Sequence, residues 1–183
     1  MKIDVGRIVI AHLRTLRDAG RSRVSRFDIV MFYGFPFAAG VAAAWLRWKF
    51  GADVLNALLT AYSIFAGLLL NLLLLVYTFS TQTVHPSALA KARTMLVREL
   101  HDNIAYSILV SIVLVVICMA STAYVKMSDP PASTNRWVTA TIIFLTLNFV
   151  LTLLMILKRI YELLNAELAK PEPVADYRRT NAR

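Results

Sequence analysis

The chain reads VLNALLTAYSIFAGLLLNLLLLVYTF from Val54 to Phe79, a stretch without Asp, Glu, Lys, Arg or His. Three further stretches share this property, Ile29–Leu46, Asn103–Val125 and Trp137–Leu157. At about 1.5 Å per helical residue, each is long enough to cross, or nearly cross, a hydrocarbon layer of roughly 30 Å. Backbone groups inside lipid must bond within their own segment, so these stretches predict helices. The sequence therefore predicts an all-α polytopic membrane protein with four transmembrane helices.

The positive charges predict an orientation for these helices. Of the 20 Lys and Arg residues, only Arg47, Lys49, Lys126 and Arg136 lie in the loops after the first and third spans. The remainder lie before the first span, between the second and third, or after the fourth. The positive-inside rule then predicts a bacterial inner-membrane protein with both termini in the cytoplasm. This arrangement, with attraction to the anionic lipids of the inner leaflet, explains the net charge of +9 without nucleic acid as a partner.

Residues 1–26 predict a basic amphipathic helix and its link to the first span. Ile8, Val9 and His12 fall on one face of a helical wheel, so we expect the helix to lie on the inner headgroup layer with this face toward the lipid. The basic residues of this segment are expected at the membrane surface: Arg7, Arg14, Arg17, Arg21, Arg23 and Arg26.

The remaining chain is predicted to form a four-helix bundle over 27–169 and a disordered cytoplasmic tail over 170–183. No Gly or Pro separates residues 87–102 from the third span, so one helix is expected from Ser87 to about Val125. An apolar stripe continues past the fourth span through 158–169. We expect these helical extensions, 87–102 and 158–169, to pack together as a short cytoplasmic stalk. The spans themselves are expected near 29–46, 54–79, 103–125 and 137–157.

Neutral polar and small residues interrupt the apolar spans. Amides and hydroxyls at lipid depth require partners, and they serve either as a gate or as hydrogen bonds between helices; these residues are Asn71, Asn148, Ser63 and Ser111. Small residues four apart allow helices to approach closely; they include Gly40, Ala44, Gly67 and Ser107. Such surfaces exceed what one bundle can bury, which predicts a homo-oligomer with a tetramer as the leading expectation. Pro36, shortly after Gly34, is expected to bend the first helix.

No catalytic constellation is present in the spans, which contain no acidic residue and no histidine. His101 and Asp102, with Glu99 nearby, form the closest titratable group. We interpret it as a solvated helix entry with an Arg98–Asp102 pair. The sequence therefore predicts a protein that is not an enzyme and uses no metal and no cofactor, and the lack of charge in the spans disfavours a proton-coupled transporter.

A resemblance to a known class of proteins rests on two stretches of the chain. They are the second span, AYSIFAGLLLNLLLLVYTF (Ala61–Phe79), and the entry to the third helix, RELHDNIAYSILVSIVLVV (Arg98–Val116). A four-span chain with long inner extensions and negligible outer loops resembles the small membrane subunits of bacterial anti-phage defence modules, such as the membrane component of the Kiwa system. That resemblance implies a protein that senses or perturbs the inner membrane together with a cytoplasmic protein partner.

Two functions follow as hypotheses. The first is a homo-oligomeric sensor or membrane-perturbing effector that is triggered through the cytoplasmic extensions, with anti-phage defence as its expected setting. The second is an anchor subunit that recruits a soluble enzyme to the membrane. A small channel or transporter is a third alternative.

Overall fold

A computed structural model describes residues 5–15, 30–81, 88–128 and 133–168. The described residues are helical apart from short connections, and they include no strand. The predicted tail at 170–183 lies outside them, as do residues 16–29, which join the N-terminal helix to the rest. The helices in chain order are α1 (Val5–Thr15), the π-helix η1 (Val30–Gly34), α3 (Phe35–Trp45), α4 (Ala52–Thr81), α5 (Ala88–Met127) and α6 (Arg136–Leu168).

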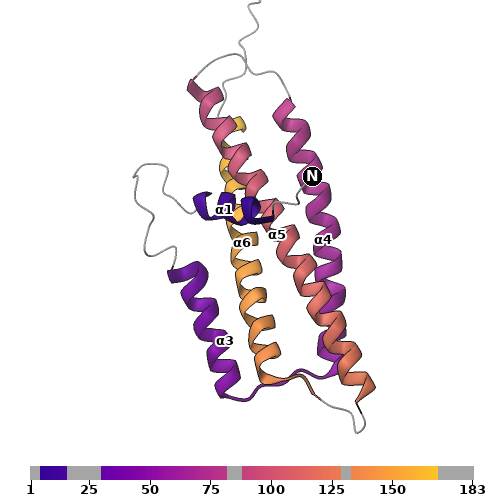
Figure 1. Ribbon diagram of the computed structural model, residues 1–183. Coiled ribbons are helices and arrows are strands. Elements are labelled where there is room, and N and C mark those ends of the chain that lie inside the picture. Colours follow the sequence, from indigo (N-terminus) through magenta and orange to yellow (C-terminus); the bar gives the residue numbers. More distant parts are fainter. Residues whose placement is uncertain (1–4, 16–29, 82–87, 129–132, 169–183) are drawn as a thin grey trace, which may run out of the picture.

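The helices pack in a row, and α1 crosses it. α4 contacts α5, α5 contacts α6, and α6 contacts α3, while α1 contacts α5. Figure 1 shows α6 between α3 and α5, with the short α1 lying crosswise to the row where it contacts α5. The large apolar side chains that are fully buried inside the row come from α4, α5 and α6: Leu55, Ile104, Leu114, Ile142 and Phe149.

Large apolar side chains also cover the outside of the row. Leu68 on α4 is 58% exposed, Ile112 on α5 is 51% exposed, and Leu154 on α6 is 56% exposed. A soluble monomer rarely exposes apolar surface on this scale. Three helices are long and apolar enough to cross a membrane, over Ala52–Thr78, Thr94–Met127 and Arg136–Asn165. The chain is therefore a helical membrane protein.

The predicted first span differs from the other three. It corresponds to a shorter apolar helical segment, Val30–Trp45, which covers only about 24 Å at 1.5 Å per residue. The structure thus gives three helices of full spanning length, and a fourth crossing is not confirmed. Where a bend was predicted, at Gly34 and Pro36, the chain changes from the π-helix η1 to the α-helix α3.

α5 and α6 both continue past their apolar segments at the same end of the molecule. α5 is one helix from Ala88 to Met127, close to the predicted Ser87–Val125. Across the two extensions, Arg159 Nη2 lies 2.9 Å from Glu99 Oε2, with both side chains largely buried. Because this ion pair joins α5 to α6, it ties the two extensions together. The predicted Arg98–Asp102 pair is wrong, since Asp102 instead lies 3.4 Å from His101.

The opposite end, which we call the loop end, is formed by residues 46–51 and 133–135. Arg47 follows Leu46, the C-cap residue of α3, with φ 56°, and the amides of Arg47 and Trp48 bond to the carbonyls of Ala44 and Ala43. This pattern is a Schellman cap with arginine at the position that glycine usually occupies. No described glycine has positive φ.

The two connections at the loop end bond to each other. The Phe50 amide donates to Thr134 Oγ1 at 2.9 Å, and the Thr134 amide donates to the Phe50 carbonyl at 3.1 Å. Thr134 Oγ1 also lies 2.7 Å from Thr139 Oγ1 in the first turns of α6. The connection after α3 is therefore fixed to the start of α6.

Candidate functional site

The most polar buried region lies where α1 crosses α5. His12 of α1 is fully buried, and its Nδ1 lies 2.9 Å from Asn103 Oδ1 of α5. Its ring stacks on Tyr106 with centroids 3.9 Å apart and planes 1° apart. Since the amide oxygen can only accept, Nδ1 carries the proton of this bond. One histidine thus docks α1 onto α5 by both a hydrogen bond and a stacking contact.

The contact continues from α5 into α6. The Tyr106 hydroxyl donates to Asn148 Oδ1 at 2.8 Å, and Asn148 is 1% exposed. Tyr33 of η1 is also placed to interact with the Tyr106 hydroxyl. We call His12, Asn103, Tyr106 and Asn148 the docking cluster; it connects α1, α5 and α6.

Asn148 then connects the cluster to the irregular helix η1. Its Nδ2 donates to the Phe32 carbonyl at 3.2 Å. In a regular helix that carbonyl would accept from the amide of residue 36, but Pro36 has no N–H to donate. The Asn148 amide replaces the missing backbone donor, as lipid-depth backbone requires. The break at Pro36 and the amide at Asn148 therefore form a matched pair on two helices.

The buried face of α5 carries further polar groups below Asn103. Ser107 and Ser111 follow at four-residue intervals and are fully buried. Ser111 Oγ donates to the Ile108 carbonyl at 2.8 Å, whereas Ser107 Oγ has no hydrogen-bond partner among the described residues. On α6, Thr152 Oγ1 donates to the Asn148 carbonyl at 2.8 Å. Polar groups thus extend from the docking cluster into the helix row.

Burial lowers the pKa of His12, and its hydrogen bond with Asn103 acts in the opposite direction. The histidine is thereby held neutral in the docked position, because desolvation disfavours the imidazolium form. Docking of α1 is consequently coupled to the protonation state of one side chain.

The predicted polar residues separate into two groups. Asn148, Ser111 and Ser107 lie in or beside the docking cluster, in the interior. Asn71, Ser63 and Gly67 lie on the exposed face of α4, away from it. Ser63 Oγ bonds to the Leu59 carbonyl of its own helix, but the Asn71 amide has no hydrogen-bond partner among the described residues. The sequence predicted a hydrogen-bond partner inside the protein for both asparagines. The described part of the chain supplies one only for Asn148.

The small residues separate in the same way. Gly40 is buried, and a Cβ at that position would lie 3.0 Å from the Ala140 carbonyl oxygen of α6. Ala44 is buried on the same helix. These two residues therefore serve packing of α3 on α6 within one chain. A Cβ at Gly67, by contrast, would meet nothing within 4 Å.

α1 is placed differently from the sequence expectation. Its Ile8 and Val9 pack against the protein core, whereas Ile10 is 51% and Leu13 is 43% exposed. The predicted lipid-directed face thus contacts α5 in this structure. Arg7 is exposed. Arg14 lies in α1 but its side chain is not described, and Arg17, Arg21, Arg23 and Arg26 lie outside the described residues.

Sequence reasoning missed the importance of His12, Asn103 and Tyr106. A histidine on the apolar face of an amphipathic helix is the signal that could have identified a docking residue, because such a group needs a buried polar partner. Its partner could not be chosen from the sequence, since Asn103 is 91 residues away. Among the described residues, no group of three or more His, Cys, Asp or Glu could hold a metal ion.

Comparisons with protein-family models, characterised proteins and solved structures found no match to this chain. The docking cluster and the exposed face of α4 are therefore interpreted from their own chemistry.

Proposed function

We propose that this protein is a non-enzymatic, homo-oligomeric membrane sensor or effector of the bacterial inner membrane, in which α1 is the input element. The observation that carries the proposal is the docking of a basic amphipathic helix onto the membrane helices through a buried histidine. The exposed Ile10 and Leu13 leave α1 with apolar surface for lipid or for a cytoplasmic protein partner. Exchange of α1 between α5 and such a surface is the proposed signal.

The docking cluster supplies a route for this signal. Removal of His12 takes a hydrogen bond from Asn103 and uncovers the ring of Tyr106, whose hydroxyl bonds to Asn148 and, through it, to η1. Since buried polar networks lose stability when only partly satisfied, release of α1 favours a new packing of α5, α6 and η1. A role in anti-phage defence remains a proposal that rests on the resemblance of the sequence alone.

Self-association is supported by the exposed face of α4. Thr60, Ser63, Gly67 and Asn71 share this face and are all exposed in the single chain. An amide directed toward hydrocarbon without a partner is unfavourable, and a second copy supplies one together with close packing at Gly67. We propose a closed ring, with a tetramer as the leading expectation.

The test of the input element uses spin labels on α1 and on the extension of α6. In protein carrying Ile10→Cys, Tyr161→Cys and Cys118→Ala, His12→Ala should broaden and shift the distance distribution between the labels. The reason is that this change removes the docking contacts and leaves the exposed side chains unchanged. Leu13→Ala is the matched control, because that side chain is 43% exposed on the same helix. An unchanged distance distribution in the His12→Ala protein would contradict the proposal.

The effector role is tested with the same variant in vesicles filled with a fluorescent dye. The His12→Ala protein should release dye faster than the wild type at equal protein density. If neither protein releases dye or conducts ions, the effector role is wrong, and recruitment of a soluble partner by a released α1 becomes the better account.

A further inference from the structure

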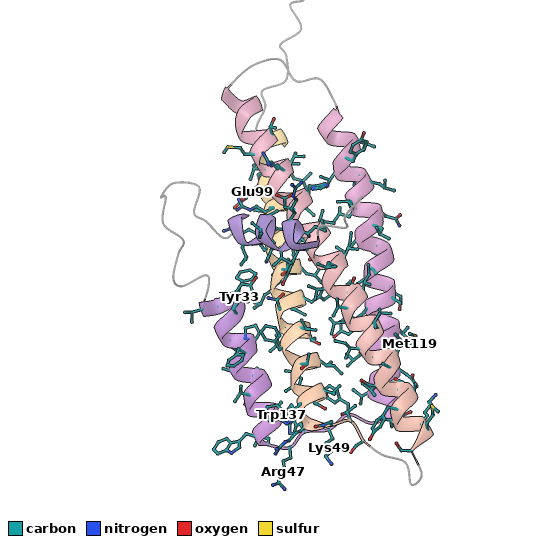
Figure 2. All side chains as sticks on the ribbon, in the orientation of Figure 1. Tyr33, Arg47, Lys49, Glu99, Met119 and Trp137 are labelled. Atoms are coloured by element: carbon teal, nitrogen blue, oxygen red, sulfur yellow. The ribbon has the colours of Figure 1, made fainter. Side chains whose placement is uncertain are left out.

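The loop end contains a hollow of about 360 Å³ that is lined by three cations. Arg47 and Lys49 come from the connection after α3, and Arg136 is the first residue of α6. Figure 2 shows Arg47 and Lys49 at the lower end of the view, with Trp137 beside them. Its volume lies within the range of roughly 300–1,000 Å³ that is typical of small-molecule pockets.

The hollow is formed by backbone that the fold holds in place. The Schellman cap orients Arg47, and the paired hydrogen bonds between Phe50 and Thr134 fix one connection against the other. Thr134 is a lining residue and is 2% exposed. The Arg136 guanidinium lies 5.2 Å from the centroid of the Trp137 ring, a cation–π contact that restricts its position.

No described residue neutralises the positive charge of the hollow. Its lining includes no acidic residue, and none of the three cations forms an ion pair with a described residue. α6 begins at Arg136 with no acidic residue in its first turn. The positive end of the helix dipole therefore adds to the three cations, which repel one another across the hollow.

The donors around the hollow suit an oxyanion with several acceptor oxygens. Two guanidinium groups can each donate two parallel hydrogen bonds to a phosphate, and Lys49 adds a mobile ammonium group. Tyr124 and Ser133 contribute hydroxyls to the same lining. The exposed Trp48 and Trp137 at this end are typical of residues at the headgroup layer. We infer that this hollow binds a phosphate group, presented by an anionic lipid headgroup or by a free phosphate ion.

The test compares two sources of phosphate with the full-length protein. Phosphatidylglycerol is titrated into nanodiscs of phosphatidylcholine, and inorganic phosphate is titrated into protein in a neutral detergent. The change in tryptophan fluorescence gives an apparent Kd for each. Saturable binding of phosphatidylglycerol alone identifies the lipid source, and saturable binding of inorganic phosphate identifies the free ion.

Three variants remove one cation each while the fold is retained. Arg47→Gly suits the positive φ at that position, and Lys49→Gln and Arg136→Gln keep polar side chains. Each should weaken binding about tenfold, as expected for loss of a hydrogen bond to a charged group. Lys126→Gln is the matched control, because Lys126 is an exposed cation at the same end that does not line the hollow.

The inference is overturned if neither probe binds saturably to the wild-type protein. It is also overturned if Lys126→Gln weakens binding as much as the three lining variants, since that result would reflect overall charge and not a site. Size-exclusion profiles and circular dichroism check that each variant is folded before its Kd is interpreted.

Discussion

Glu99 and Arg159 form an ion pair of 2.9 Å between α5 and α6, beyond the apolar parts of both helices. Their side chains are only 25% and 20% exposed, so the pair is less screened than one at the surface. Arg159 also lies 3.6 Å from Glu162 on its own helix. The two helical extensions are therefore joined by a specific contact as well as by their apolar stripe.

Glu99→Gln should lower the free energy of unfolding by about 1 kcal/mol, because it leaves Arg159 partly buried without its partner across the helices. Lys158→Gln is the control. Lys158 is 75% exposed and lies 3.8 Å from Glu162 on the same helix, so its removal should have little effect. Unfolding in mixed micelles measures both variants, and equal effects would show that the pair does not join the extensions.

Asn148→Leu should destabilise the protein by about 1–2 kcal/mol, because it removes the bonds to Tyr106 and to the Phe32 carbonyl together. The loss should be larger than for Thr146→Val on the same helix, which removes the 2.6 Å contact to Tyr62 and a local bond to the Ile142 carbonyl, because Thr146 is only partly buried and Asn148 is 1% exposed. Unfolding of both variants under matched conditions decides this. If Asn148 also acts as a gate, the variant should lose activity in the dye-release assay even when its protein density is matched to the wild type.

Asn71→Leu should leave the stability of the single chain unchanged and weaken self-association, because its amide is exposed and bonds to no described residue. Gly67→Leu should have the same effect by holding the helices apart. Ala120→Leu, which enlarges an exposed small residue on α5, is the matched control. Light scattering in detergent measures the mass of each variant. A wild-type protein that stays monomeric at high concentration would contradict the oligomer.

Arg47→Gly should stabilise the protein by about 1 kcal/mol, since arginine holds φ 56° at a cost that glycine avoids. The same variant is expected to bind phosphate less well, so stability and binding should change in opposite directions. Thermal unfolding without added phosphate measures the first effect alone. A destabilised Arg47→Gly protein would show that the arginine side chain contributes more to the fold than its backbone conformation costs.

Acid should release α1. The docked histidine has a lowered pKa, so docking is strongest above the ordinary histidine pKa of about 6.5 and weakens as the pH falls below it. Below that value the released form takes up a proton that the docked form disfavours. The distance between labels on α1 and α6 should therefore change between neutral and mildly acidic pH. In the His12→Gln protein this pH dependence should disappear.

The sequence indicated the class of fold but not the relations between helices. Long uncharged stretches predicted four spanning helices, because lipid permits few alternatives to helix, and three of the four have full spanning length in the structure. The uncharged stretch Ile29–Leu46 is the shortest of the four, but the sequence could not show that the helix begins as a π-helix whose Phe32 carbonyl accepts a hydrogen bond from Asn148 of another helix. Local sequence does not contain such pairings.

The candidate site was predictable only in part. The sequence showed that Asn71 and Asn148 are polar residues in apolar helices. It did not show that Asn71 is exposed and Asn148 is buried. Asn71 interrupts a leucine-rich helix, and Asn148 interrupts an apolar helix that also contains threonines. Only the packing of neighbouring helices decides which asparagine is buried. His12 was assigned correctly to the apolar face of its helix, yet the surface that this face covers is provided by α5.

The 91 residues that separate His12 from Asn103 also set an order of events during synthesis. At about 5–20 residues per second, the ribosome needs roughly 5 to 18 s to make the intervening chain. Throughout that interval the newly made α1 has no α5 to receive it. In each new molecule α1 is therefore released at first. It reaches the docked arrangement only after α5 has been made and has entered the membrane.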